Sequence, residues 1–166
     1  MRKFVLVTCL ALAAAIAVPS VASAEPFSGS FDNTIRKKDV APCGAALTCG
    51  TGTIAGYGAA SFVLVPTGVP VPADGCLEIP AQVILTLADG GGTLTLSGTG
   101  LACTPGRSGE APGQERSFGN PLRATGTFSV TGGTGVFAGA TGTISGTLRL
   151  AGAHVSLQLS GDVSTS

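Results

Sequence analysis

Alternation of apolar and polar positions with a period of two dominates the chain after residue 25, and helical spacing is nearly absent. The clearest alternation occupies residues 82–87, 93–97, 143–149 and 154–160. Weaker signals of the same kind occupy residues 27–31, 51–65 and 122–131. A strand with one face on a core and the other in water has this pattern. We therefore predict an all-β protein built from antiparallel strands.

The first of two predicted hairpins turns at Asp89-Gly90, a strong turn dipeptide. This turn places Leu85 opposite Leu94, and apolar residues face apolar residues along both strands. A slip of one residue would move every side chain to the other face. The pattern therefore predicts the register of this hairpin.

The second predicted hairpin turns at Ala151-Gly152. In that register Leu148 faces Val155, and polar residues again face polar residues. The same register places His154, the only histidine, opposite Arg149 on the polar face. We interpret these two as a solvent-facing cross-strand pair rather than as catalytic residues, because no carboxylate and no nucleophile can be assigned beside the imidazole.

Four of the five cysteines follow residue 25, and an even number in an exported chain favours two disulfides. The spacing contains no C-x-x-C pair, so we expect neither a metal site nor a cofactor. In the first hairpin Cys76 lies opposite Cys103. A four-residue loop puts this pair and Pro80 at non-hydrogen-bonded positions, where the Cα atoms are close enough for a disulfide. Cys43 would then bond to Cys49.

The chain begins with two basic residues, an apolar run from Phe4 to Val18 and a group of small residues. This order is typical of a secretory signal peptide, cleaved here before Glu25. The apolar run is too short to span a bilayer comfortably, and no later segment is continuously apolar, so we expect no transmembrane segment after cleavage. The prediction is a signal peptide over residues 1–24 and one secreted domain over residues 25–166.

The charge of the chain mainly excludes certain classes of partner. Because Arg2 and Lys3 would leave with the signal peptide, seven of the nine basic residues remain beside nine acidic ones. The chain has no basic face, so nucleic acid and anionic membranes are not expected as partners. Residues 104–121 are polar and rich in glycine and proline, which predicts a long loop.

Residues 130–142, VTGGTGVFAGATG, contain a match to the G-x-G-x-x-G/A fingerprint of dinucleotide-binding loops. Such a loop needs a helix after the glycines to direct N–H groups at phosphates, and an alternating strand follows here instead. We therefore expect a tight connection between strands. Gly132, Gly133 and Gly135 would adopt positive φ, and Phe137 would pack into the core.

The longer segment over residues 126–142 resembles the part of dirigent proteins and allene oxide cyclases where a strand meets a G-G-T-G-x-F-x-x-A-x-G turn. The pattern is filled by Gly132, Gly133, Thr134, Gly135, Phe137, Ala140 and Gly142. The resemblance implies an eight-stranded antiparallel barrel with an apolar cavity. Barrels of these families are often trimeric, so the resemblance also implies a homo-oligomer.

The number of predicted strands also favours a barrel. The two hairpins supply four strands, and residues 27–31 and 122–131 supply two more. Residues 51–65 are long enough for one bent strand or two. Closure into a barrel of about eight strands removes the exposed edges of such a sheet. A β-sandwich is one alternative, and a β-solenoid, suggested by recurring Thr-Gly-Thr, is another.

The predicted interior has no titratable side chain. Its inward positions in the two hairpins are Leu77, Ile79, Val83, Leu85, Leu87, Leu94, Leu96, Ile144, Leu148, Val155, Leu157 and Leu159. Acid–base catalysis requires a titratable group within reach of the substrate. We therefore expect a non-catalytic barrel that binds a small apolar ligand or a cell-envelope component, with Tyr57 as a candidate pocket residue. A dirigent-like or allene oxide cyclase-like isomerase or cyclase and a structural surface protein are the alternatives.

Overall fold

The computed structural model describes residues 24–34, 43, 48–103 and 122–165, and most of these residues lie in β-strands. Along the described chain the elements are β1 (Glu25–Thr34), β2 (Thr48–Ile54), β3 (Gly58–Pro66), β4 (Val71–Ala73), β5 (Cys76–Leu87), β6 (Thr93–Cys103), β7 (Leu122–Gly133), the 3-10 turn η1 (Gly135–Phe137), β8 (Thr141–Ala151) and β9 (His154–Ser164). Residues 1–23 of the predicted signal peptide and the predicted loop 104–121 lie outside the described residues.

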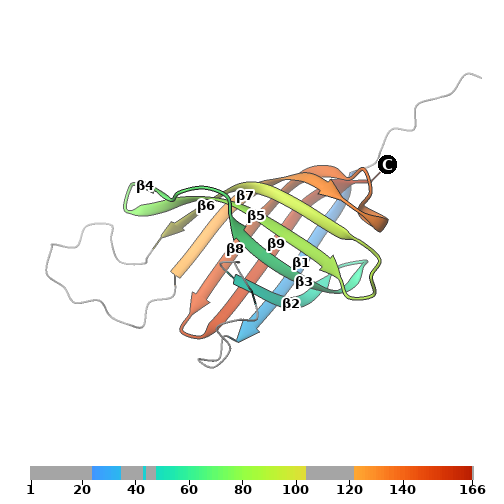
Figure 1. Cartoon of the computed structure of the whole chain (residues 1–166), viewed down its shortest axis with the longest axis horizontal. Coiled ribbons are helices and arrows are strands. Elements are labelled where there is room, and N and C mark those ends of the chain that lie inside the picture. Colours follow the sequence, from blue (N-terminus) through green and yellow to red (C-terminus); the bar gives the residue numbers. More distant parts are fainter. Residues whose placement is uncertain (1–23, 35–42, 44–47, 104–121, 166) are drawn as a thin grey trace, which may run out of the picture.

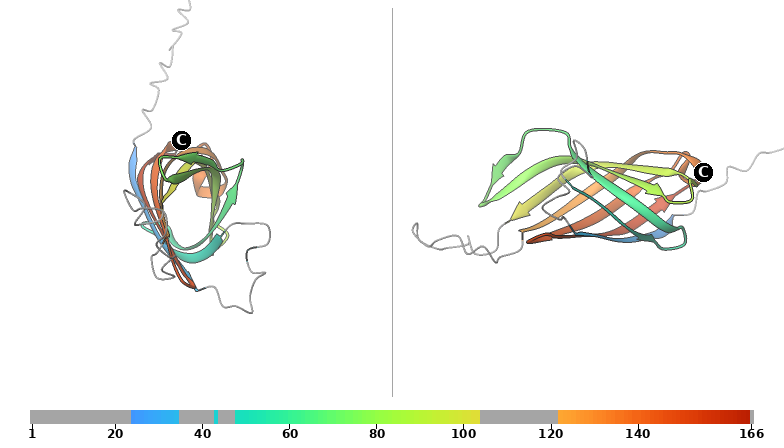
Figure 2. Two further views of the ribbon diagram at one scale, coloured as in Figure 1. Left: turned by 90° about the vertical axis from the view of Figure 1, so that its left-hand side faces the viewer. Right: turned by 60° about the horizontal axis from the view of Figure 1, so that its bottom comes forward.

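Eight of these strands form a closed antiparallel barrel (Figures 1 and 2). Neighbours around the barrel follow the order β3-β2-β1-β9-β8-β7-β6-β5. The sheet closes because β3 also pairs with β5, from Ala60 opposite Leu87 to Pro66 opposite Ala81. The predicted all-β barrel is confirmed, and the segment 51–65 contains two strands, β2 and β3, rather than one bent strand.

The short strand β4 was not expected from the sequence. It pairs with the beginning of β5 through a two-residue turn at Asp74-Gly75, where both residues have positive φ, 45° and 79°. Asp-Gly is a favoured pair for such a turn. Pro80 lies between the part of β5 that pairs with β3 and the part that pairs with β4. Its missing N–H therefore leaves both ladders intact.

The register predicted for the first hairpin is confirmed. In the pairing of β5 with β6, Leu85 lies opposite Leu94 and Cys76 lies opposite Cys103. The Leu87 N–H donates to the Gly92 carbonyl at 3.0 Å, which closes the turn.

The register predicted for the second hairpin was wrong by two residues. Gly152 and Ala153 form the turn, and Leu148 lies opposite Leu157 rather than Val155. A shift of two keeps the apolar residues on the same face, so alternation alone does not distinguish the two registers. The turn itself decides, because Gly152 at its first position has φ 61°, which a two-residue hairpin requires.

Phenylalanine rings fill part of the interior and lie over glycines of the same strand or of a neighbouring strand. A Cβ atom at Gly50 would lie 2.7 Å from the Phe62 ring, and one at Gly126 would lie 3.1 Å from the Phe128 ring. Phe62 also packs edge-on against Phe31, with ring centroids 5.5 Å apart. Alternation of large and small inward residues is how small barrels fill their interiors. Part of the high glycine content therefore makes room for these rings.

One end of the barrel is closed by Phe137, which is buried in η1 and packs against Tyr57 with ring centroids 4.7 Å apart. We call this the plugged end. Of the three glycines expected to have positive φ, only Gly135 does, at 59°. The prediction was wrong for Gly132 and Gly133. Gly133 is required for a different reason, since a Cβ there would overlap Phe137, at 2.8 Å from its Cβ.

Candidate functional site

The opposite end of the barrel holds an apolar cavity of about 130 Å³. We call this the cavity end; it carries the β4–β5 and β8–β9 hairpins (Figure 1). Aliphatic and aromatic side chains from six strands form much of the wall, among them Leu64, Ile79, Val83, Phe128, Leu148 and Leu157. The volume is close to that of an apolar protein cavity of about 150 Å³ that binds benzene. It suits one ring or a short alkyl chain.

The wall contains no Asp, Glu, Lys, Arg or His among the residues that the structure describes. Its two hydroxyl-bearing residues are Thr48 and Thr125. Thr125 occupies an exposed position of β7, whereas Thr48 is only 2% exposed. Thr48 is therefore the buried polar side chain of the cavity, and its Oγ1 has no hydrogen-bond partner within the described structure.

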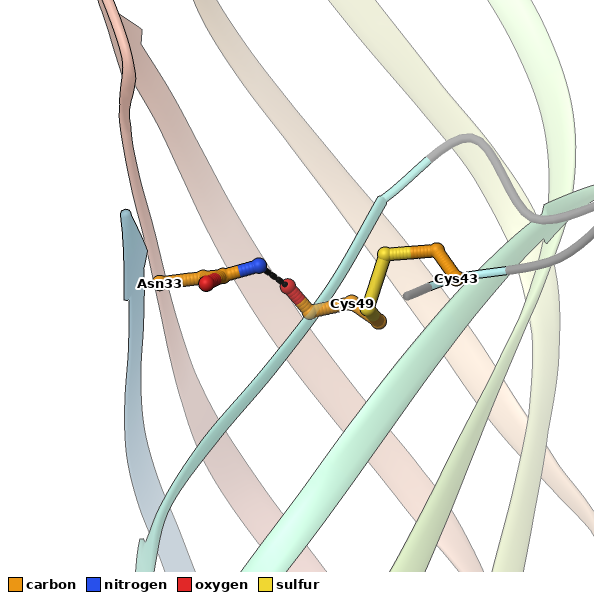
Figure 3. Close-up of a disulfide and its surroundings, with 3 residues drawn as sticks. All are labelled: Asn33, Cys43 and Cys49. Atoms are coloured by element: carbon orange, nitrogen blue, oxygen red, sulfur yellow. Dashed lines mark hydrogen bonds between the residues drawn. A yellow bond between two sulfur atoms is a disulfide. The ribbon is translucent and has the colours of Figure 1, made fainter. Parts of the chain in front are cut away.

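Thr48 is the first residue of β2. Two interactions of the next residue, Cys49, hold this end of the strand (Figure 3). The adjacent Cys49 forms a disulfide with Cys43. The side-chain amide of Asn33 in β1 donates a hydrogen bond to the Cys49 carbonyl at 2.7 Å. The backbone next to Thr48 is thus attached to Cys43 and to β1, which limits the movement of the backbone there.

The second disulfide joins Cys76 to Cys103, as the first hairpin predicted. The Cα atoms are 4.3 Å apart, which matches the short spacing of a non-hydrogen-bonded antiparallel pair. This disulfide joins the beginning of β5 to the end of β6, next to Ala102 in the cavity wall. Both disulfides therefore lie at the cavity end.

Tyr57 does not line the cavity, contrary to the prediction. It belongs to the turn between β2 and β3, which lies at the plugged end, where it packs against Phe137. Leu77 was also expected inside and is instead 46% exposed. It lies on the part of β5 that extends beyond β3, so no barrel interior remains there to receive it.

Thr48 was missed by the sequence reasoning. The alternation that indicates a strand begins only at residue 51, and a threonine beside a cysteine carries no signal of burial. The hydroxyl becomes a candidate only when β2 pairs with β3 and places Thr48 opposite the inward-facing Leu64.

A second group of polar side chains lies in a groove on the outer surface. Asp32 of β1 and Arg149 of β8 are both paired with Ser156 of β9, so these residues form a row across three strands. His154 lines the same groove at the start of β9, opposite Ala151. The predicted pairing of His154 with Arg149 was therefore wrong, as a consequence of the shifted register.

Comparison of the chain with protein-family models, curated proteins and solved structures finds no match. Within residues 24–34, 43, 48–103 and 122–165, no group of three His, Cys, Asp or Glu side chains is arranged to hold a metal ion. The same residues include no helix that is long and apolar enough to cross a membrane. The geometry of the cavity is thus the basis on which a function can be proposed.

Proposed function

We propose that this chain is a secreted, non-catalytic β-barrel protein that binds a small apolar molecule at its cavity end. The observation that carries the proposal is the cavity wall, which is apolar and has no titratable side chain among the described residues. Ligand sites are concave, mostly apolar and supplied with a few polar groups. A wall of this composition supplies contact and shape, whereas acid–base catalysis needs a proton-transferring group.

Secretion is supported by the two disulfides, since such bonds form and persist in oxidising compartments. It agrees with the signal peptide expected from the sequence. Because both disulfides lie at the cavity end, oxidation would also stabilise the part of the barrel that binds the ligand.

The expected affinity follows from the size of the cavity. A benzene-sized ring has six carbon atoms, and burial contributes about 0.8 kcal/mol for each carbon group, or about 5 kcal/mol in total. That free energy corresponds to a Kd of about 0.2 mM, which is the tightest binding expected because the entropy cost of association is still to be subtracted. Binding should thus be measurable by NMR titration of the methyl groups of Leu64, Leu148 and Leu157, which line the cavity.

Substitution at Gly100 tests the site directly. Gly100 lines the cavity, and a Cβ there would have no heavy atom nearer than about 4.0 Å, so a larger side chain can enter the free space. Gly100→Leu should abolish benzene binding and leave the fold intact. Thr99→Leu is the control, because the neighbouring residue of β6 points away from the interior. Absence of benzene binding by the wild-type protein, or equal binding by Gly100→Leu, would contradict the proposal.

An alternative proposal is a dirigent-like role, in which the cavity holds a reactive apolar intermediate in a fixed pose. The eight-stranded antiparallel barrel supports it, because this is the fold that the resemblance of residues 126–142 implies. In that case the chain would contribute orientation, and the chemistry would be that of the intermediate.

A further inference from the structure

We propose that the ligand of the cavity is neutral and carries a single hydroxyl or carbonyl group, which forms a hydrogen bond with Thr48 Oγ1. The rest of the ligand is an apolar body of about the size of one ring. This inference rests on the proposed function of the cavity as a binding site and adds the chemical class of its ligand.

The first observation is the unpaired hydroxyl itself. Thr48 is 2% exposed, and its Oγ1 is the buried side-chain oxygen or nitrogen without a hydrogen-bond partner among the described residues. Most buried polar atoms have such a partner, and an exception calls for an explanation. Thr48 lies in the cavity wall, but its Oγ1 is itself almost inaccessible in this structure. The side chain therefore has to turn about χ1 for the hydroxyl to meet the polar group of a ligand in the cavity.

The second observation is that the backbone beside this hydroxyl is held in place. The disulfide of Cys49 and the hydrogen bond from Asn33 fix the backbone beside Thr48. Threonine is branched at Cβ, which restricts its χ1 rotation. A backbone that is ordered before the ligand arrives, and a side chain with few rotamers, lower the entropy cost of binding.

The polarity of the ligand follows from the rest of the wall. With no basic side chain among the described wall residues, a carboxylate would be buried without a counter-charge, which is strongly unfavourable. A threonine hydroxyl both donates and accepts hydrogen bonds, so it suits either a hydroxyl or a carbonyl oxygen. A lone water is a poorer partner, since a buried water makes about three hydrogen bonds and the wall offers one buried hydroxyl.

Benzene and phenol form a matched pair of probes, because they differ by one hydroxyl group. The affinities of both are measured for the wild-type protein and for Thr48→Val, which replaces the hydroxyl by a methyl group. We expect the preference for phenol over benzene to fall by about tenfold or more in Thr48→Val, since the phenol hydroxyl is then buried unpaired. Benzene affinity should change by less than about twofold, because its contacts are apolar.

Thr51→Val is the control, because it makes the same change of side chain at an exposed position of the same strand. It should leave both affinities unchanged. Thr48→Val should in addition raise the midpoint of urea unfolding of the ligand-free protein, because it removes a buried hydroxyl without a partner. A lower midpoint would show that the hydroxyl is already satisfied in the free protein, and would overturn the inference.

The two proposals fail in different ways. If benzene binds the wild-type protein and the phenol preference is the same in Thr48→Val, the hydroxyl does not recognise the ligand. The inference is then overturned, and the apolar site stands. If neither benzene nor phenol binds the wild-type protein, the proposed function fails, and the inference fails with it.

Discussion

Alanine at Gly133 should displace Phe137 from the plugged end of the barrel, whereas alanine at the adjacent Gly132 should be tolerated. Both glycines end β7, and neither has positive φ. An added Cβ at Gly133 would overlap the Phe137 carbonyl oxygen and lie 2.8 Å from its Cβ, while one at Gly132 would have nothing within 4 Å. The two substitutions are chemically identical and differ in the space available.

The change in unfolding free energy caused by each alanine substitution can be estimated from two opposing effects. Replacement of glycine by alanine at a compatible position stabilises a protein by about 0.4–1 kcal/mol, because the unfolded chain loses freedom. This effect acts at both sites. Gly133→Ala also overpacks the region around Phe137, at a cost of about 1–3 kcal/mol. Complete loss of the ring from its site would cost about 3–5 kcal/mol. We therefore expect Gly133→Ala to be less stable than Gly132→Ala by about 3 kcal/mol.

Urea unfolding followed by circular dichroism measures this difference. The chain has a single tyrosine and no tryptophan, so its fluorescence reports on Tyr57, which packs against Phe137. The tyrosine emission of the folded protein should change in Gly133→Ala and stay the same in Gly132→Ala. Unfolding free energies within about 0.5 kcal/mol of each other would show that the close approach of Gly133 to Phe137 does not stabilise the plugged end.

Two further predictions concern the turn of the second hairpin and the disulfides. Gly152→Ala should cost about 1–2 kcal/mol of unfolding free energy, because φ is 61° there and no atom lies within 4 Å of an added Cβ, so backbone strain acts alone. An unchanged urea midpoint would argue against this turn. Replacing the Cys76–Cys103 disulfide by two serines should cost about 3.6 kcal/mol, against about 2.4 kcal/mol for Cys43–Cys49, because the sequence separations are 27 and 6. Equal losses of stability would contradict this order.

The sequence by itself determined the fold class and the local pairing of one hairpin. Alternation with a period of two is a property of each strand alone, so it predicts strands and inward faces before any partner is known. In the β5–β6 hairpin the Asp89-Gly90 turn and the apolar pattern agree, and they placed Cys76 opposite Cys103. In the β8–β9 hairpin the same pattern gave the correct faces and the wrong register, because it repeats every two residues.

Only the tertiary structure decided where the barrel closes and where its interior stays empty. Closure depends on the pairing of β3 with β5, and that pairing placed Leu77 outside the barrel. The pairing of β2 within the barrel carries Thr48 to the cavity wall, and η1 places Phe137 over Gly133 at the other end. The pairing of β3 with β5, the pairing of Thr48 with Leu64 and the packing of Phe137 against Tyr57 each join residues that are distant in the chain. A local pattern records which side of a strand is apolar, but the space in front of that side is set by the strands on the opposite wall.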